Sequence, residues 1–148
     1  ADEPADPKPP NQGREDDLDA LAAFIDSLVA PLSPGHAQGQ LLTPAERRGQ
    51  ALYDDLGCAV CHLAPLYTDK NRHDVGTATS ADGTTTAFDT PSLRGLYDSA
   101  PYFHNGSAST MREAITFASP GGEHDVSGRL SEPEIQDLLL YLLALPYE

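Results

Sequence analysis

Basic side chains are scarce in this sequence of 148 residues, because Lys and Arg together number 9 against 23 Asp and Glu. The formal net charge of −14 repels nucleic-acid phosphates and anionic membrane surfaces, which excludes a DNA-, RNA- or polybasic membrane-binding function. No apolar run approaches the roughly 18 to 20 residues that cross a bilayer, and the amino-terminal residues lack a basic segment followed by an apolar one. A membrane span is therefore not expected in this chain.

Cysteine, tryptophan and methionine are also rare. The chain has two cysteines, no tryptophan and one methionine, Met111. Cys58 and Cys61 are too few for a disulfide scaffold and too close together to staple a domain of this size. Residues classed as hydrophobic make up 39% of the chain, which is enough for one modest core and favours a single main domain.

The composition divides the chain into three parts. Residues 1–15 are rich in proline and charge and are expected to form a flexible leader. Residues 16–40 are predicted to be an extra helix and a connector, because apolar residues recur every three or four positions over 16–29. The same spacing returns in the last predicted helix, so 16–40 is either the remnant of an upstream domain or simply another amphipathic helix. Residues 41–148 form the main domain.

The main domain opens with full helix-start signals. Thr43 is the expected N-cap, Pro44 the first helical residue and Glu46 the partner that completes a capping box. The small residue Gly49 on the apolar side lets another helix approach closely. This helix is expected to stop near Gly57.

Two further helices are expected towards the carboxyl end. One is capped by Ser109 or Thr110 and runs through Phe117, and the last is capped by Ser131. Residues 63–101 are rich in Gly, Thr, Asp and Pro and predict a long irregular segment, which in a compact domain usually wraps around something. No alternating strand of convincing length occurs, so the predicted fold class is all-α.

The segment Cys58-Ala59-Val60-Cys61-His62 has the Cys-x-x-Cys-His pattern of covalent haem attachment. Its two thiols add to the two vinyl groups of haem, the two intervening residues set the thiol separation, and the adjacent histidine reaches the iron. The favoured interpretation is one covalent c-type haem with His62 as the proximal iron ligand.

Two other uses of a Cys-x-x-Cys pair are less favoured. A thioredoxin-like redox pair needs a βαβ context that this chain lacks. A zinc site needs two more ligands, which would come from a set of four histidines: His62, His73, His104 and His124.

The flanking residues carry a family resemblance. Residues 42–53 and 57–62 look like the first helix and haem-binding turn of class I c-type cytochromes. The carboxy-terminal haem domain of the di-haem cytochrome c peroxidase superfamily is resembled by four further segments: 66–69, 73–77, 88–96 and 100–106. The resemblance implies a class I cytochrome c-like helical domain with long irregular loops, whose haem takes or relays electrons. The peroxidatic haem of those enzymes lies in their other domain.

The ligand opposite His62 decides the chemistry, because a closed six-coordinate iron transfers electrons while an open one binds peroxide or gas. In the resembling domain the ligand lies between the last two helices, where this chain has His124 in a Gly-rich segment and no methionine. His124 is the preferred sixth ligand, which predicts bis-His ligation. Met111 is the alternative, although its place at the start of an amphipathic helix favours core packing.

Four other residues are predicted to lie near the haem without ligating the iron. The resemblance places His104 near the haem, where a neutral imidazole can bond a propionate or a backbone carbonyl. His73 is interpreted in the same way. Tyr102 shares the segment of His104, and the planar guanidinium of Arg94 suits a propionate.

These residues predict electron transfer by a haem iron that cycles between Fe(III) and Fe(II). Two alternatives stay open. One is a haem peroxidase-like enzyme with an open or switchable distal site, where His104, His124 or Glu123 acts as general acid or base. The other is a haem-based redox or gas sensor that moves the loop around His124.

The haem attachment motif and the acidic composition also predict the location of the protein and the kind of partner it binds. Covalent haem attachment implies maturation outside the cytoplasmic membrane, so the predicted location is periplasmic or extracellular in a bacterium. The predicted partners are a redox protein with a basic docking face, because this chain is acidic, and a fused upstream domain.

Overall fold

The computed structural model describes residues 16–29, 33, 41–118 and 123–145. Backbone contacts divide the chain into two compact units, residues 1–31 and residues 32–148. Among the described residues, none of the helices combines the length and the apolar character of a membrane span.

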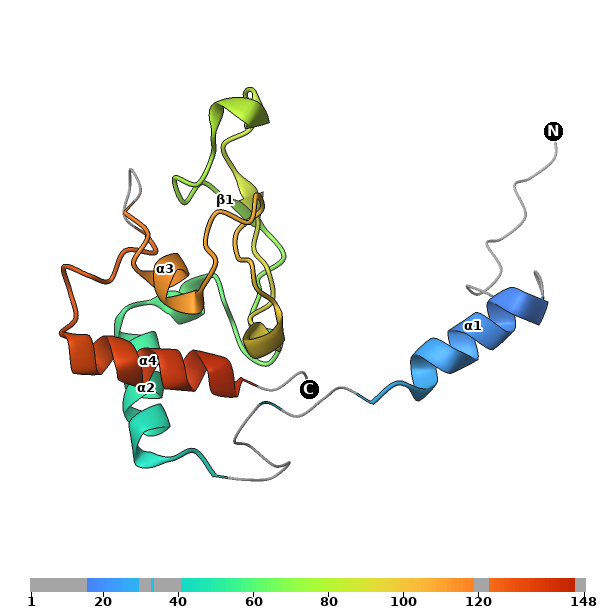
Figure 1. Ribbon diagram of the computed structural model, residues 1–148, viewed down its shortest axis with the longest axis horizontal. Helices are drawn as coiled ribbons and strands as arrows, with labels where there is room; N and C mark the ends of the chain where they lie inside the picture. Colours follow the sequence, from blue (N-terminus) through green and yellow to red (C-terminus); the bar gives the residue numbers. More distant parts are fainter. Residues whose placement is uncertain (1–15, 30–32, 34–40, 119–122, 146–148) are drawn as a thin grey trace. The chain divides into compact units, whose positions relative to one another are not determined.

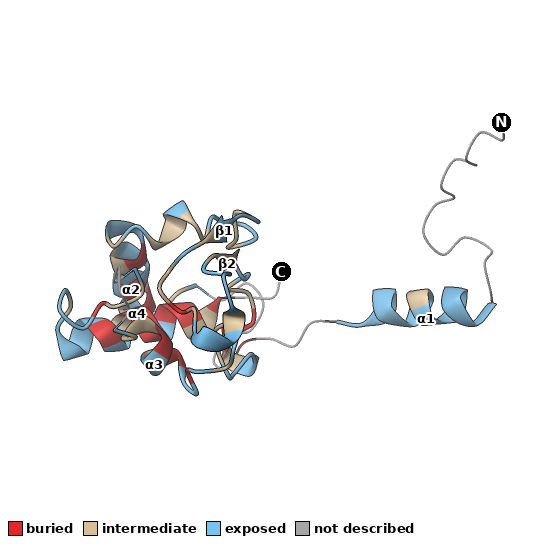
Figure 2. Cartoon of the chain, turned by 90° about the horizontal axis from the view of Figure 1, so that it is seen from above, coloured by how far each residue is buried: buried red, intermediate tan, exposed pale blue. Residues whose placement is uncertain are grey.

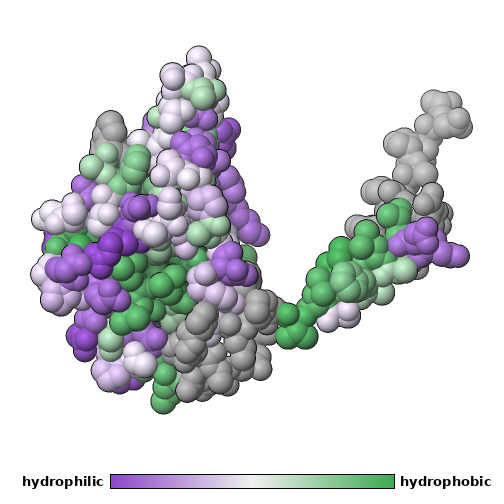
Figure 3. Space-filling view, viewed as in Figure 1, coloured by the Kyte–Doolittle hydropathy of each residue, from purple (hydrophilic) through white to green (hydrophobic). Residues whose placement is uncertain are grey.

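The described part of the first unit is helix α1, Asp16–Ser27, which lies where the apolar spacing predicts it (Figure 1). Three aspartates occupy its first turn, where carboxylates interact favourably with the helix dipole. None of its residues is buried, and its apolar side chains lie exposed along the helix (Figure 3). The origin of α1 in an upstream domain stays a prediction.

The second unit is built mainly from helices in its described part. In chain order its elements are α2 (Pro44–Asp55), η1 (Cys58–Val60), β1 (Arg72–His73), η2 (Ser80–Asp82), β2 (Phe88–Asp89), η3 (Leu96–Asp98), α3 (Met111–Ile115) and α4 (Glu132–Ala144). Buried residues lie on α2, α3 and α4, whereas neither strand carries one (Figure 2). The helices therefore supply most of the core, to which Ala108, Val126 and Leu145 add from outside the helices, and the strands contribute no buried residue.

Helix α2 begins and ends where the sequence predicts. The Thr43 hydroxyl accepts from the Glu46 backbone N–H at 3.3 Å, and the Glu46 carboxylate accepts from the Thr43 N–H at 2.6 Å, which completes the capping box. At the other end, Leu56 caps the helix. Gly57 then adopts a left-handed φ of +81°, which glycine accommodates most easily, and turns the chain directly into η1.

The closest contact in the core is between α2 and α4. A Cβ on Gly49 would lie 2.1 Å from the Asp137 carbonyl oxygen and 2.8 Å from the Tyr141 Cβ, so the two helices meet backbone to backbone there. Beside this contact, Arg48 donates two hydrogen bonds to the Asp137 carboxylate at 2.6 and 2.8 Å. Helix α4 contributes five buried side chains: Ile135, Leu138, Leu139, Tyr141 and Leu142.

Helix α3 is shorter than the sequence predicts. Its N-cap is Thr110 rather than Ser109, because the Thr110 side chain accepts a backbone N–H from the first turn. The predicted extension through Phe117 is wrong, since α3 ends at Ile115. The Ile115 carbonyl instead accepts from the Val126 N–H at 3.0 Å, which joins the helix end to the segment before α4.

The structure also contains a small antiparallel pair of strands. Arg72 lies opposite Asp89, and His73 lies opposite Phe88. Sequence analysis expects no strand, and strands of two residues offer no alternation from which to predict one. The pair joins two stretches within the long irregular segment and leaves the fold mostly helical.

Replacing Gly49 by Ala tests the close contact. Intrinsic helix propensity favours Ala by about 1 kcal/mol, yet the new methyl group would push into the Asp137 carbonyl. We expect Gly49→Ala to lower the free energy of unfolding by about 3 kcal/mol in urea titrations. Gly128→Ala is the control, because its Cβ would meet nothing within 4 Å, and it should change stability by less than about 0.5 kcal/mol. Equal stability of the two variants would contradict the packing described.

Candidate functional site

One short turn after α2 holds both cysteines and the first candidate ligand. The Val60 N–H donates to the Gly57 carbonyl at 3.0 Å, and the His62 N–H donates to the Cys58 carbonyl at 2.9 Å. Cys58 and Cys61 are free and partly buried, and burial raises the pKa of both thiols. The turn therefore presents two neutral thiols and an imidazole from five consecutive residues.

Backbone contacts fix the orientation of the His62 ring. Its Nδ1 lies 3.1 Å from the Tyr67 carbonyl, which can only accept, so Nδ1 carries the proton and Nε2 keeps its lone pair for a metal. The Tyr53 hydroxyl donates to the His62 carbonyl and holds the backbone from the side of α2. Burial lowers the pKa of His62, which favours the neutral form that ligates metals.

His124 faces His62 across a gap that fits one metal ion. The ring centroids are 6.4 Å apart and the ring planes make an angle of 34°. Two metal–nitrogen bonds of about 2.0–2.1 Å, plus about 1.1 Å from each nitrogen to its ring centre, give about 6.3 Å between the centroids. Burial, followed by the proximity of His62, lowers the pKa of His124, so this ring also favours the neutral ligating form. The donor set thus fits a haem that Cys58 and Cys61 would attach covalently and whose iron His62 and His124 would ligate.

Phe103 supports His124 and was missed by the sequence analysis. Its ring stacks on the His124 ring with centroids 5.7 Å apart and planes at 11°, and Phe117 packs edge-on against it at 5.1 Å. Phe103 has a left-handed φ of +67°, an uncommon conformation for an aromatic residue that the surrounding loop must stabilise. Only the structure shows that this residue, rather than Tyr102 or His104 on either side, faces the candidate ligand.

His104 and Tyr102 make structural contacts in the loops. The His104 ring stacks on Phe88 at 3.6 Å, and its Nε2 lies 3.3 Å from an Asp82 carboxylate oxygen. The Tyr102 hydroxyl donates to the Leu96 carbonyl at 2.6 Å. These contacts tie the segment around residue 103 to β2, η2 and η3. The expected contact of His104 or Tyr102 with the cofactor stays a prediction.

Arg94 and Met111 also have defined surroundings. The Arg94 Nε donates to the Pro65 carbonyl at 3.1 Å, which closes the loop that follows the attachment turn; its pairing with a propionate stays a prediction. Met111 is 8% exposed and belongs to the hydrophobic core with Ala114. This position favours the core-packing interpretation of Met111 over the ligand alternative.

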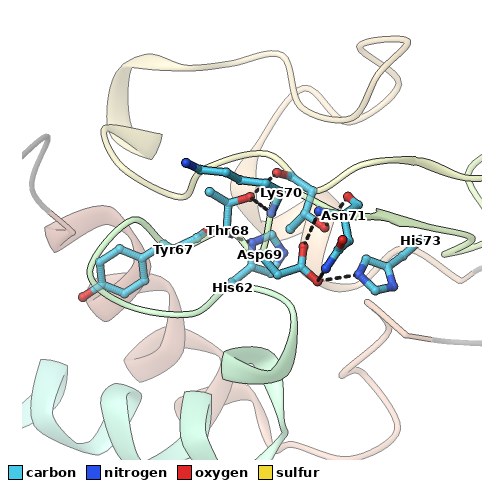
Figure 4. A network of polar contacts seen from close by, with 8 residues as sticks. His62, Tyr67, Thr68, Asp69, Lys70, Asn71 and His73 are labelled. Atoms are coloured by element: carbon cyan, nitrogen blue, oxygen red, sulfur yellow. Dashed lines mark hydrogen bonds and ion pairs between the residues drawn. The ribbon is translucent and has the colours of Figure 1, made fainter.

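A second cluster adjoins the attachment turn. Ligand atoms of Cys61, Asp69 and His73 all lie within 4.8 Å of one another, and His73 Nε2 is 2.7 Å from Asp69 Oδ2 (Figure 4). The zinc alternative expects both cysteines with two histidines, whereas this group contains one cysteine, one carboxylate and one histidine. Asp69 was not predicted, because an aspartate in a polar loop has no distinctive sequence pattern.

Known proteins resemble this chain over most of its length. Residues 46–146 match the Cytochrome c family. The chain is 31% identical to hydrazine synthase subunit gamma of Kuenenia stuttgartiensis, in an alignment that covers 86% of this chain and 48% of that protein. It superposes on a solved structure of hydrazine synthase from the same organism with a TM-score of 0.69 and 32% identity, over 86% of this chain and 55% of that one.

Two other relatives come from different bacteria. Methylamine utilization protein MauG of Methylorubrum extorquens is 30% identical, over 87% of this chain and 43% of that protein. Cytochrome c peroxidase Ccp of Escherichia coli is 26% identical, over 88% of this chain and 32% of that protein. The chain therefore spans between about a third and a half of the length of these three curated relatives.

The Phe103 stack predicts how firmly His124 is held. An aromatic stack contributes about 0.5–1.5 kcal/mol, so Phe103→Ala should raise the rate at which cyanide displaces His124 from ferric haem about 2- to 10-fold. Stopped-flow absorbance measures this rate. Phe88→Ala, which removes the stack on His104 instead, should leave the rate unchanged. If both variants respond equally, Phe103 has no specific role at His124.

Proposed function

Given that this chain belongs to the cytochrome c family, we propose that it transfers electrons through one covalently attached haem. The match confirms the expected resemblance and the all-α, cytochrome c-like fold class. Members of this family hold haem c covalently, and a haem redox role follows for this chain. When bound, the haem iron supplies a one-electron couple between Fe(III) and Fe(II).

Each residue of the site has a part in this proposal. Cys58 and Cys61 supply the thiols for the two thioether bonds, and one attachment motif provides for one haem. His62 supplies Nε2 to one face of the iron because Tyr67 fixes its Nδ1 proton. His124 supplies the opposite imidazole. The observation that carries the proposal is the 6.4 Å spacing of the two rings, which fits one metal ion between them.

A site closed by two imidazoles favours electron transfer over catalysis. Two protein ligands leave no open position for peroxide or gas. The Tyr67 carbonyl holds one ring and the Phe103 stack holds the other, so neither ligand needs to reorient when the oxidation state changes. Both rings are favoured in the neutral form, which keeps them available to the iron in either state.

A peroxidase-like activity is the second candidate. It is supported by the likeness to cytochrome c peroxidase Ccp and by Glu123, an exposed carboxylate next to His124 in the chain. If His124 were to leave the iron, Glu123 would be placed to exchange protons with an incoming peroxide. Carbon monoxide and peroxide distinguish the two candidates, because a closed site ignores both and an open one responds within mixing time.

The surface around the attachment turn suits a protein partner. Val60 and Leu63 flank Cys61 and His62 and are 79% and 59% exposed, so apolar side chains are available for contact there. The chain carries a net charge of −14, which favours a basic redox protein as the partner. A periplasmic or extracellular location in a bacterium is part of this proposal, because covalent haem attachment takes place outside the cytoplasmic membrane.

Salt dependence tests the charge of the partner. Electron exchange with a basic c-type cytochrome should slow as ionic strength rises from 0.01 to 0.15 M, because the Debye length falls from about 30 Å to about 8 Å. Stopped-flow mixing at several salt concentrations measures the rate. A rate that is independent of salt, or that rises with it, would contradict electrostatic attraction.

Removal of each candidate ligand tests the coordination. We expect wild-type ferric protein to be low-spin in electron paramagnetic resonance and optical spectra. His124→Ala should convert most of the iron to high-spin, whereas Met111→Ala should keep the low-spin signal and lose about 2–5 kcal/mol of stability as a core truncation. A high-spin wild type would favour the peroxidase-like candidate, and loss of the low-spin signal in Met111→Ala alone would make Met111 the ligand.

A further inference from the structure

Asp69 lies beside the attachment turn although its place in the sequence is seven residues beyond His62. The loop returns through Tyr67, whose carbonyl receives the His62 Nδ1 proton at 3.1 Å. Two residues later, an Asp69 carboxylate oxygen comes within 4.8 Å of the Cys61 Sγ and of a His73 ring nitrogen. Asp69 is the centre of the polar network in Figure 4.

The network keeps the Asp69 carboxylate ionised and fixed in place. Its oxygens accept from the Asn71 backbone N–H at 2.9 Å and from the Asn71 side-chain amide at 3.2 Å. His73 Nε2 lies 2.7 Å away on the same carboxylate. The Asn71 backbone contact, followed by the His73 contact, holds the pKa of Asp69 well below its usual range. The carboxylate therefore carries a negative charge at neutral pH.

This charge is shielded from water and reaches the proposed haem site. The Asp69 side chain is only 17% exposed, so solvent screens it less than the many acids on the surface. One of its oxygens lies within 4.8 Å of the Cys61 Sγ, and Cys61 is next to His62 in the chain, so the charge lies beside the residues proposed to attach the haem and ligate its iron. A fixed charge this close to the attachment turn would also act on a haem iron bound there.

We propose that the negative charge of Asp69 lowers the reduction potential of the haem iron by stabilising the ferric form. This inference rests on the proposed function. Reduction adds one electron to the iron and removes one positive charge there, so a fixed nearby carboxylate favours the oxidised state by Coulomb attraction. The network around Asn71 and His73 holds the carboxylate in place for this effect.

The cluster of Cys61, Asp69 and His73 is less suited to binding a metal ion. Once Cys61 is joined to haem, its sulfur is a thioether, and only Asp69 and His73 remain as strong ligands. Zinc sites in proteins have at least three such ligands. The cluster is therefore better matched to electrostatic control of the adjacent haem than to a second metal ion.

Replacing Asp69 by Asn tests the proposal by spectroelectrochemistry of the haem-loaded protein. Asp69→Asn keeps the side-chain shape and should raise the equilibrium constant for reduction about tenfold, which is about 59 mV for one electron. Asp69→Glu, which restores the charge, should return the potential towards the wild-type value. Asp89→Asn removes the same charge from an exposed position on β2 and should produce a clearly smaller shift. Equal shifts in Asp69→Asn and Asp89→Asn, or no shift in either, would overturn the proposal.

If Asp69→Asn fails to fold, two variants of His73 test the same effect of charge on the reduction potential. The His73 side chain is 39% exposed, so we expect its replacement to preserve the fold. His73→Lys puts a permanent positive charge against Asp69 and should give a higher potential than His73→Gln, which is neutral. Equal potentials would overturn the proposal. Failure of the proposed function is a separate result, because the wild type would then show no low-spin haem spectrum at all.

Discussion

The imidazoles of His62 and His124 face each other with 6.4 Å between their centroids, and the rest of the second unit holds them there. His62 is fixed by the turn at the end of α2, which in turn depends on the backbone contact between α2 and α4 at Gly49. The His124 ring stacks on Phe103, and Phe103 packs against the hydrophobic core. A gap suited to one metal ion therefore arises from elements that are far apart in the sequence.

Charge is distributed unevenly around this gap. The two imidazoles are favoured in the neutral form, because burial opposes their protonation. The chain carries a net charge of −14, and the carboxylate of Asp69 is held next to the attachment turn by Asn71 and His73. In this account the net negative charge affects the rate at which a partner associates, and the partly buried Asp69 carboxylate affects the reduction potential of the iron.

Local sequence patterns predicted the parts of the structure that depend on neighbouring residues. The capping box at Thr43 and Glu46, the end of α2 near Gly57 and the attachment motif all follow from residues close together in the chain. The end of α3 and the contact of Phe103 with His124 depend on segments that are separated along the chain. No periodicity or motif records such contacts. His104 shows the same limit, since its observed partners, Phe88 and Asp82, come from a loop that the sequence leaves irregular.

X-ray absorption at the iron edge of the ferric, haem-loaded protein tests the central claim most directly, because it counts the atoms bound to the iron and identifies their element. Ligation by His62 and His124 predicts six nitrogen neighbours, four from the haem and two from imidazoles, with no sulfur in the first shell. A sulfur neighbour would assign Met111 to the iron. A five-coordinate iron would show that His124 does not close the site and that peroxide chemistry is open to this protein.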